Sequence, residues 1–266
     1  MTDINSIVFY SQSTDRSGFV DKILTRFKEE ITGKILVKVN LVSHEPYPTT
    51  THPDMLEAVL KYLQGKDISV GDGPAIDIGK FRKEKTDIYK ICKQFDVPFV
   101  NFYDLEMQTL KSPSNYELTF SNLPSQCDYI ISLPILKIHI ECSITGALKN
   151  AFGYLSKKNR LLMHMGKKNI HQGIAELNTF VKPNLTIMDG IKTLINANEV
   201  RHGGLKRNLG YLLAGKDPVA LDVYGFSLLK KIDPTWAPNS PQDIPHVKNA
   251  IDLGIGNPDY KLYEIK

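Results

Sequence analysis

The sequence contains few cysteines, and no two of them are spaced like a metal-binding or redox pair. Cys92, Cys127 and Cys142 are its three cysteines in 266 residues. Zinc fingers and cysteine-ligated iron–sulfur clusters take their ligands from closely spaced cysteines, so we expect neither within this chain. An odd number of cysteines at such wide spacing also argues against a disulfide framework and favours a reducing compartment.

Long apolar runs are absent as well. No stretch reaches the roughly 18 apolar residues that a transmembrane helix requires, so we predict no membrane span. Residues 1–11 carry neither a basic start nor a long apolar core, and they do not resemble a signal peptide. These features predict a soluble, cytoplasmic protein with no membrane partner.

Neither sign of charge is in large excess. The chain has 33 basic and 29 acidic residues, for a net charge of +4. This balance allows a small acidic partner but does not require one. Aromatic side chains are not interleaved with the basic ones, as the stacking platform of a nucleic-acid binder requires, so nucleic acid is a disfavoured partner. Walker A and G-x-G-x-x-G motifs and a Ser or Cys nucleophile signature are also missing.

Short apolar runs alternate with longer amphipathic segments along the chain. This rhythm, with nearly continuous apolar strands, predicts an α/β fold with a mainly parallel sheet flanked by helices on both faces. We expect one domain over residues 1–266, with room for a bilobal arrangement, and a hairpin or loop insertion between Leu105 and Leu123. The expected strands are Ser6–Ser11, Lys34–Val42, Ile68–Gly71, Val97–Tyr103, Tyr129–Leu136, Leu185–Met188 and Tyr211–Ala214. The expected helices are Asp15–Ile31, Pro53–Gln64, Gly79–Phe95, Ile144–Leu155, Ile170–Phe180 and Pro218–Lys231.

Polar residues gather where the expected strands end. In open α/β sheets, ligands bind in the crevice beyond the carboxyl ends of the strands. We therefore expect these side chains to meet around one positively charged pocket. They are Lys38, Asn40, Asp72, Lys137, His139 and Asp189.

The segment Leu133–Gly153 gives the most specific signal. Lys137 and His139 are two residues apart at the end of an apolar strand, so both side chains lie on one face of the sheet. Lys149 and Asn150 follow shortly after. Burying an ammonium group without a partner is costly, and an anionic ligand would explain this spacing.

Each of these residues also has a purely structural interpretation. Lys38 and Asn40 could lie on the wet face of an edge strand, and the Gly-Asp-Gly-Pro sequence at Asp72 is typical of a turn. Asp189-Gly190 could likewise be a turn, and His139 could be a hydrogen-bonded core residue. His52 precedes a helix that begins at Pro53, where it could contact an anion or simply cap the helix.

Two basic segments also allow both a structural and a functional interpretation. Ser156–Gln172 is rich in lysine and arginine, and it is either a solvated face or a loop that closes over an acidic substrate. Arg201 begins a second cationic segment, Arg-His-Gly-Gly, that we expect to be flexible and to contribute to substrate binding.

At these motifs the chain resembles the uncharacterised family known as domain of unknown function 362, over roughly Ile35 to Gly254. The resemblance rests on VKVNLV, TTHP, GDGP, LPILKIH…TGALKNAFG, His164, MDGI and LAGKDPVALD, in that order. The chain departs from the usual pattern at Val39, Ile135 and Leu205, where many relatives carry Pro, Lys and Pro. Many relatives also carry an appended ferredoxin-type domain, which the cysteines of this chain do not provide.

The resemblance implies a fold but no established reaction. The layout is also similar, more distantly, to the nickel-pincer lactate racemase group, in which Lys and His residues work at a cleft between two lobes. We use that similarity as an analogy only.

These residues lead to one main hypothesis, an enzyme that binds a small carboxylate- or phosphate-bearing metabolite. The expected chemistry is proton transfer next to a carbonyl group, as in an isomerase, racemase or lyase. The cofactor is left open. We assign His139 or His164 as general acid/base, because histidine titrates near neutral pH. The remaining assignments are Lys38, Lys137 and Lys149 for positive charge, Asn40 and Asn150 for hydrogen bonds, Asp72 and Asp189 for orienting a base or holding a divalent cation, and His52 and Arg201 for substrate contact.

Two alternatives stay beside it. A metal site could be built from His52, His139 and His164 with Asp72, although no two of them have tight ligand spacing. A non-catalytic accessory or maturation factor, which carries a ligand to a protein or redox partner, would need the same cationic pocket but no titrating base.

Overall fold

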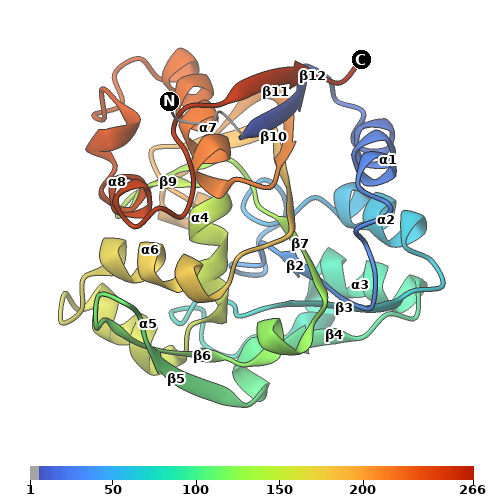
Figure 1. Ribbon diagram of the computed structural model, residues 1–266, viewed down its shortest axis with the longest axis horizontal. Coiled ribbons are helices and arrows are strands. Elements are labelled where there is room, and N and C mark those ends of the chain that lie inside the picture. Colours follow the sequence, from blue (N-terminus) through green and yellow to red (C-terminus); the bar gives the residue numbers. More distant parts are fainter. Residues whose placement is uncertain (1–5) are drawn as a thin grey trace.

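An eight-stranded sheet forms the centre of the molecule, in the order β12-β1-β11-β10-β7-β2-β3-β4. The computed structural model describes residues 6–266 (Figure 1). Strand β11 runs antiparallel to both of its neighbours, while the other strands share one direction, so the expected mainly parallel sheet is confirmed. The strands are β1 (Ile7–Ser11), β2 (Lys34–Val39), β3 (Asp67–Asp72), β4 (Phe99–Asn101), β7 (Tyr129–Leu133), β10 (Leu185–Ile195), β11 (Leu205–Gly215) and β12 (Lys261–Glu264).

Helices cover both faces of this sheet, as expected (Figure 1). One face carries α1 (Arg16–Arg26), α2 (Pro53–Tyr62) and α3 (Asp87–Gln94). The other carries α4 (Ala147–Asn150), α5 (Lys157–His164), α6 (Ile170–Phe180), α7 (Pro218–Ile232) and α8 (Pro245–Asp252). Within residues 6–266, no helix combines the length and apolar character needed to span a bilayer.

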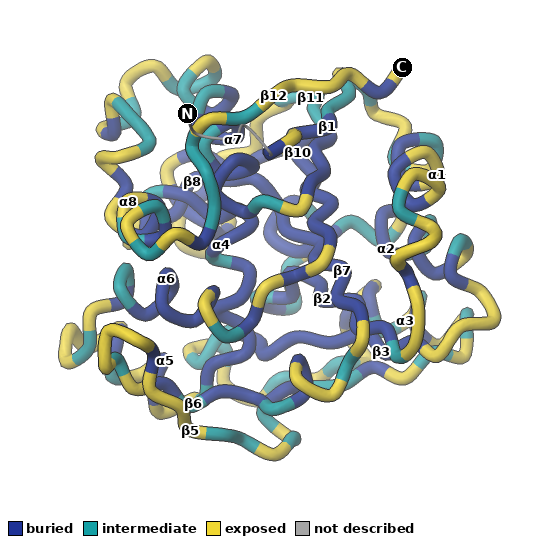
Figure 2. Tube along the Cα trace, viewed as in Figure 1, coloured by how far each residue is buried: buried dark blue, intermediate teal, exposed yellow. Residues whose placement is uncertain are grey.

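Two buried apolar clusters follow from the alternation of side chains along the strands. In β2, Ile35, Val37 and Val39 pack toward α1 and α2, whereas Leu36 belongs to the cluster on the opposite face. Lys38 and Asn40 therefore share the face of Leu36. The central strands are buried on both faces (Figure 2).

Two helix starts lie where the sequence places them. The ring nitrogen Nδ1 of His52 accepts a hydrogen bond from the backbone N–H of Asp54, and Pro53 is the first residue of α2. Asp217 likewise caps α7 by accepting from the backbone N–H groups of Val219 and Ala220. Both caps satisfy donors that the first helical turn leaves free.

Two hairpins lie outside the main sheet. Strands β5 (Met107–Lys111) and β6 (Glu117–Ser121) form the insertion expected between Leu105 and Leu123. Strands β8 (Lys137–His139) and β9 (Ser143–Thr145) form the second. The expectation that Lys137 and His139 end the strand from Tyr129 is wrong, because β7 stops before Pro134, which has no backbone donor for the ladder.

Strand β10 is longer than the sequence suggests. The prediction of a turn at Asp189-Gly190 is wrong, because the strand continues to Ile195 and pairs with β11 along its length, with an irregularity near Gly190. The tip of this hairpin contains a short 3-10 helix, Val200–His202, in place of the expected flexible loop.

The basic segment Ser156–Gln172 is also not a loop. Ser156 accepts a hydrogen bond from the backbone N–H of Asn159 and caps α5. Asn169 caps α6 in the same way. Within α5, Lys157 and Lys158 are exposed, whereas Arg160 is buried.

Helix α4 carries Lys149 and Asn150, and it is held at its N-terminus by a buried carboxylate. Asp222 of α7 accepts hydrogen bonds from the backbone N–H groups of Ala147 at 2.6 Å and Leu148 at 3.1 Å. Burial raises the pKa of Asp222 to about 7. A Cβ atom at Gly146 would lie 2.0 Å from the Oδ1 atom of Asp222. Glycine is therefore required where the chain enters α4.

We predict that Gly146→Ala destabilises the protein by about 1–3 kcal/mol, the usual cost of overpacking, because the added methyl group must displace a hydrogen-bonded buried carboxylate. Urea unfolding monitored by circular dichroism measures this change. An unfolding midpoint equal to that of the wild type would contradict the close contact between Gly146 and Asp222.

Candidate functional site

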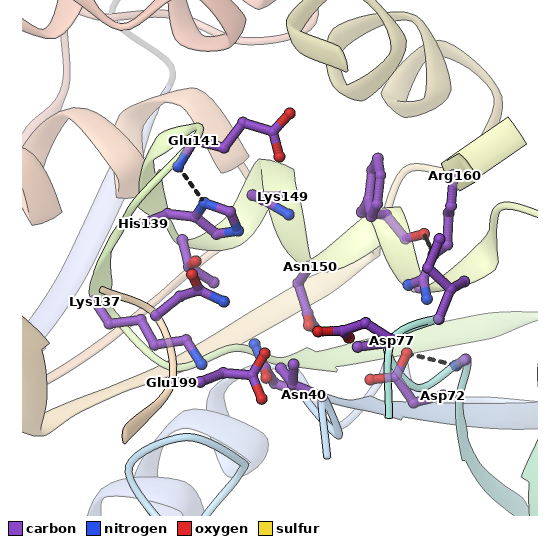
Figure 3. A pocket seen from close by; sticks show the side chains of 18 of the residues that line it. Asn40, Asp72, Asp77, Lys137, His139, Glu141, Lys149, Asn150, Arg160 and Glu199 are labelled. Atoms are coloured by element: carbon purple, nitrogen blue, oxygen red, sulfur yellow. Dashed lines mark hydrogen bonds between the residues drawn. The ribbon is translucent and has the colours of Figure 1, made fainter. Parts of the chain in front are cut away.

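A cavity of about 330 Å³ lies where β2, β3 and the β8–β9 hairpin meet α4 and α5 (Figure 3). It is at the carboxyl end of the parallel strands, as expected for this kind of sheet. Pockets of this size hold small metabolites. The charged and polar residues that line it are Lys38, Asn40, Asp72, Asp77, Lys137, His139, Glu141, Thr145, Lys149, Asn150, Arg160, His164, Asn198, Glu199 and His202.

Most of the residues proposed from the sequence meet here. Those that line the cavity are Lys38, Asn40, Asp72, Lys137, His139, Lys149, Asn150 and His164. His52, Asp189 and Arg201 do not line it.

Asp189 and His52 lie on the opposite face of the sheet. Because β10 does not end at Asp189, its side chain points the same way as Ile187, toward α1. There it accepts hydrogen bonds from Arg16 Nε at 2.6 Å and from the Tyr47 hydroxyl at 2.8 Å. The His52 ring packs edge-on against Tyr47, with their centroids 4.7 Å apart. These residues build a separate polar cluster.

Arg201 is held by carboxylates. Its Nε atom lies 2.8 Å from Glu199 and its Nη2 atom lies 2.9 Å from Asp77. These hydrogen bonds, led by the one to Glu199, raise the pKa of Arg201 further above its ordinary value. Arg201 therefore pairs with Glu199 and Asp77, which line the cavity, and does not itself face a ligand.

Lys38 is an internal structural cation. Its Nζ atom lies 2.7 Å from Asp72 Oδ1, and it donates to the backbone oxygen of Val39 at 2.7 Å and to Asn150 Oδ1 at 3.1 Å. An ammonium group has three N–H donors, and all three are used. Burial lowers the pKa of Lys38 to about 8, against the opposing effect of Asp72. Lys38 is thus committed to the wall of the cavity.

Lys137 is also completely buried, but it differs from Lys38 in the number of acceptors around its nitrogen atom. Its Nζ atom donates to the backbone oxygen of Thr49 at 2.5 Å, and no ion pair to it exists among residues 6–266. Burial lowers the pKa of Lys137 to about 7, with Lys149 lowering it and Glu199 opposing. A large share of this side chain is therefore a neutral amine at neutral pH.

Lys149 of α4 lies near His139 in the wall of the cavity (Figure 3). In the described part of the chain its ammonium group has neither a hydrogen bond nor an ion pair, and it lies 4.3 Å from the centroid of the Phe152 ring. Burial lowers the pKa of Lys149. This is a cation without a protein anion, at the edge of a cavity.

The hydrogen bonds of His139 determine its tautomer. Its Nδ1 atom accepts from the backbone N–H groups of Glu141 and Cys142, both at 3.1 Å. Burial, followed by the charges of Lys149 and Lys137, lowers the pKa of His139 well below its ordinary value. The ring is therefore neutral, with its proton on Nε2. In this state the Nε2–H group of His139 can donate a hydrogen bond to a ligand, and a general-base role does not fit the ring.

His164 has the arrangement that a general base needs. Its Nδ1 atom lies 2.8 Å from the Glu141 carboxylate, and the two side chains are 38% and 36% exposed. If Nδ1–H donates to Glu141, the other ring nitrogen is left as the acceptor. The pair connects α5 to the β8–β9 hairpin at the border of the cavity.

Arg160 is the main residue of the site that the sequence analysis does not single out. It is buried, and it donates from Nε to the backbone oxygen of Phe152 at 3.1 Å and from Nη1 to that of Pro74 at 2.5 Å. Among residues 6–266, its Nη2 atom has no hydrogen-bond partner. Ser156 is the sequence signal that could have found it, because a helix that starts there puts Arg160 on the same face as the apolar Met163, three residues later.

Three buried polar atoms of the cavity wall have no hydrogen-bond partner within residues 6–266. They are Asn40 Oδ1, Thr145 Oγ1 and Asn198 Oδ1. Buried polar groups are nearly always satisfied in folded proteins, so their clustering here indicates a place for a polar ligand.

The cavity carries charges of both signs, which refines the expected positively charged pocket. Its acids include Asp72, paired with Lys38, and Glu141, paired with His164. The basic side chains without a carboxylate partner in the described residues are Lys149, Arg160 and Lys137, the last of which is to a large extent a neutral amine. In Figure 3, Lys137 and Arg160 lie on opposite sides of the cavity.

The metal site considered from the sequence is not assembled. Nowhere in residues 6–266 do three or more His, Cys, Asp or Glu side chains form a group that could hold a metal ion. His52 lies on the other face of the sheet, and Asp72 is bonded to Lys38 and to the backbone N–H groups of Leu41 and Gly73.

The sequence and the fold match known proteins. The profile of the family described as domain of unknown function DUF362 matches residues 35–227. A thylakoid-associated protein from Synechocystis is 30% identical over 213 residues, which are 77% of this chain and 65% of the relative.

Two solved structures are similar at low sequence identity. The apoprotein of lactate racemase from Thermoanaerobacterium thermosaccharolyticum is 15% identical, with a TM-score of 0.55, and the match covers 86% of this chain and 58% of that one. A protein from Thermotoga maritima is 13% identical, with a TM-score of 0.46, and the match covers 89% of this chain and 59% of that one. The first similarity supports the α/β fold.

We predict opposite effects on stability for two lysine substitutions. Lys137→Met removes a buried, unpaired amine and should stabilise the protein by about 1–4 kcal/mol or leave it unchanged, because buried ions replaced by apolar groups behave this way. Lys38→Met leaves Asp72 buried without its partner and should cost about 3–5 kcal/mol. Urea unfolding of both variants tests this contrast, and a destabilised Lys137→Met would contradict the description of Lys137.

The pH dependence of stability should also change in Lys137→Met. In the folded wild type, the pKa of Lys137 is about 7, below its ordinary value of 10.5. Between these values the folded state binds fewer protons than the unfolded state, so the wild type loses stability as the pH falls from about 10 to about 7. The advantage of the variant should therefore grow by at most about 1.4 kcal/mol per pH unit as the pH falls from 9 to 7. Parallel stability curves for the two proteins would show that Lys137 titrates normally.

Proposed function

The chain belongs to the family described as domain of unknown function DUF362, and from the geometry of its cavity we propose that it is an enzyme that binds a small carboxylate- or phosphate-bearing metabolite and transfers a proton next to a carbonyl group. The observation that carries this proposal is the presence of Lys137, Lys149 and Arg160, which lack carboxylate partners within residues 6–266, around a cavity with unpartnered polar atoms.

Lys149 and Arg160 would bind the anionic group of the metabolite. The Lys149 ammonium has no bond within the described residues, and Arg160 keeps its Nη2 donors available. Hydrogen bonds between charged groups contribute about 1.5–3 kcal/mol each. Asn40 and Asn198 would supply further polar contacts, since each has a buried oxygen without a partner in the described chain.

His139, Lys137 and His164 would act at the reacting end. The Nε2–H group of His139 would donate to an oxygen on which negative charge develops. The His164 ring, oriented by Glu141, would take or return the proton. Lys137, whose pKa lies at about 7, would stabilise or accept charge at neutral pH.

The lactate racemase apoprotein shares this fold at a TM-score of 0.55, and lactate belongs to the class of small carboxylates proposed here. The cavity volume of about 330 Å³ supports a metabolite of modest size. Lys38, Asp72 and Asn150 would build the wall, and His52, Asp189 and Arg201 would have supporting roles away from the ligand.

A cytoplasmic location is part of the proposal, because three widely spaced cysteines favour a reducing compartment. The Synechocystis relative is named a thylakoid-associated protein. Fractionation of the native host would decide between a cytosolic pool and attachment to a membrane surface.

Hydrogen–deuterium exchange tests the reaction. We expect the wild type, in D2O, to catalyse exchange at the carbon next to the carbonyl or hydroxyl group of at least one member of a panel of 2-oxo acids, 2-hydroxy acids and phosphate esters, measured by proton NMR. His164→Gln should lower the exchange rate by about 10²–10⁴-fold while binding persists. Lys149→Met should instead weaken binding by about 10-fold or more.

The outcomes separate the two functions. Binding without exchange for every compound would favour a ligand-carrying accessory protein over an enzyme. Full exchange activity in His164→Gln would remove His164 from its role. Arg160→Met is the companion of Lys149→Met and tests anion binding on the side of the cavity opposite Lys137.

A further inference from the structure

The surroundings of Lys137 are unusual for a lysine. Its side chain is 0% exposed, and its Nζ atom donates to one backbone oxygen, that of Thr49. Lys38, also buried, shows what a structural lysine in this protein looks like, with a carboxylate and two further acceptors around its Nζ atom. Since burying an unpaired ammonium is costly, packing alone does not explain Lys137.

Burial is the main reason why Lys137 favours its neutral amine form. Lys149 of α4 opposes a second positive charge in the cavity, while Glu199 at the β10–β11 tip, Glu45 before α2 and Asp72 of β3 act in the other direction. Burial outweighs these acids, and it lowers the pKa of Lys137 to about 7. A lysine desolvated beside another cation is an activated nucleophile.

A hydroxyl group lies next to this amine. Thr145 of β9 is the direct cross-strand partner of Lys137, so the two side chains are neighbours on one face of the hairpin. The Thr145 Oγ1 atom is buried and has no partner in the described residues. Both side chains line the cavity.

We infer that Lys137 is a covalent catalyst that forms an imine with the carbonyl group of a small 2-oxo acid. This inference rests on the proposed function and specifies its substrate class, because an imine requires an aldehyde or ketone carbonyl. Lys149, which lines the same cavity, would bind the carboxylate of the same molecule.

Imine formation at Lys137 balances in atoms and in charge. The lone pair of the neutral Lys137 amine attacks the carbonyl carbon, and a C–N bond forms while the carbonyl electrons move to oxygen. That oxygen gains a proton, and the nitrogen loses one, to give a carbinolamine. A second proton on the same oxygen allows water to leave as the nitrogen lone pair forms the C=N bond. The net change is amine plus ketone plus one proton, giving a protonated imine and water.

Neighbouring residues have definite roles in this sequence. The Thr145 hydroxyl relays protons between nitrogen and oxygen, and the Nε2–H group of His139 donates to the oxygen of the carbinolamine. The protonated imine then accepts electrons when His164 removes a proton from the adjacent carbon, which yields an enamine.

Reductive trapping tests the inference. The full chain is incubated with pyruvate, or with glyoxylate as a smaller carbonyl acid, in the presence of sodium cyanoborohydride, and digested for mass spectrometry. We expect the reduced adduct on Lys137 at about 10-fold or higher yield than on Lys167, an exposed lysine that serves as the internal reference. The yield on Lys137 should rise between pH 6 and pH 8, as the fraction of neutral amine increases.

Two variants complete the experiment. Lys137→Met removes the nucleophile and puts no charge in the buried position, so it should fold and bind pyruvate but give no adduct at position 137. Lys149→Met should retain the adduct at reduced occupancy. Thermal protection by pyruvate is measured in parallel, without the reductant.

Each result bears on one hypothesis. Protection by pyruvate or glyoxylate without an adduct on Lys137 would overturn the imine and leave the proposed function intact. Trapping on Lys149 in place of Lys137 would also overturn it. Absence of both protection and adduct would count against the imine and against small 2-oxo acids as ligands, whereas exchange with other acids would keep the wider function.

Discussion

The buried ion pair between Lys38 and Asp72 is the interaction on which the site depends. It joins β2 to β3 and, through Asn150, to α4, with the nitrogen and carboxylate oxygen 2.7 Å apart. Asn150 in turn donates to Ser132 Oγ in β7 at 2.8 Å, so three strands and one helix share a single network. The chain after α4 lies so close that a Cβ atom at Gly153 would be 2.0 Å from Asp72. Because both charges are satisfied internally, the pair fixes the cavity wall and leaves the binding of a ligand to other residues.

The cavity combines groups that are fully bonded with groups that are not. Lys38 and Asp72 have every strong partner they need, whereas Lys137, Lys149 and three polar atoms of the wall lack theirs in the described chain. Unsatisfied buried polar groups cost about 1–3 kcal/mol each, and natural proteins concentrate such costs at functional sites. Lys38 therefore stabilises the fold, whereas Lys137 destabilises it unless a ligand binds.

The sequence predicts the sheet and the helices on both faces, because their apolar patterns follow from residue types. It also predicts that Lys38, Asn40, Lys137 and His139 meet, because ligands bind beyond the carboxyl ends of the strands, although the last two lie in the β8–β9 hairpin and not at the end of β7. It misplaces Asp189, since the face of that residue depends on where β10 ends and on its pairing with β11. The role of His139 was out of reach for another reason. Its tautomer follows from two backbone N–H groups in a tight hairpin turn, which no pattern of residue types specifies. Arg160 was missed because a run of basic residues conceals a short capped helix.

The ion pair between Arg201 and Asp77 makes one edge of the cavity sensitive to salt. It links the β10–β11 tip to the segment after β3, beside the lining residues Glu199 and His202, and its two side chains are 31% and 50% exposed. Pairs with this much solvent contact contribute about 0–1 kcal/mol, and added salt weakens them. The link between these two segments therefore weakens as the ionic strength rises, whereas the buried pair between Lys38 and Asp72 is screened much less, so the two sides of the cavity differ in their response to salt.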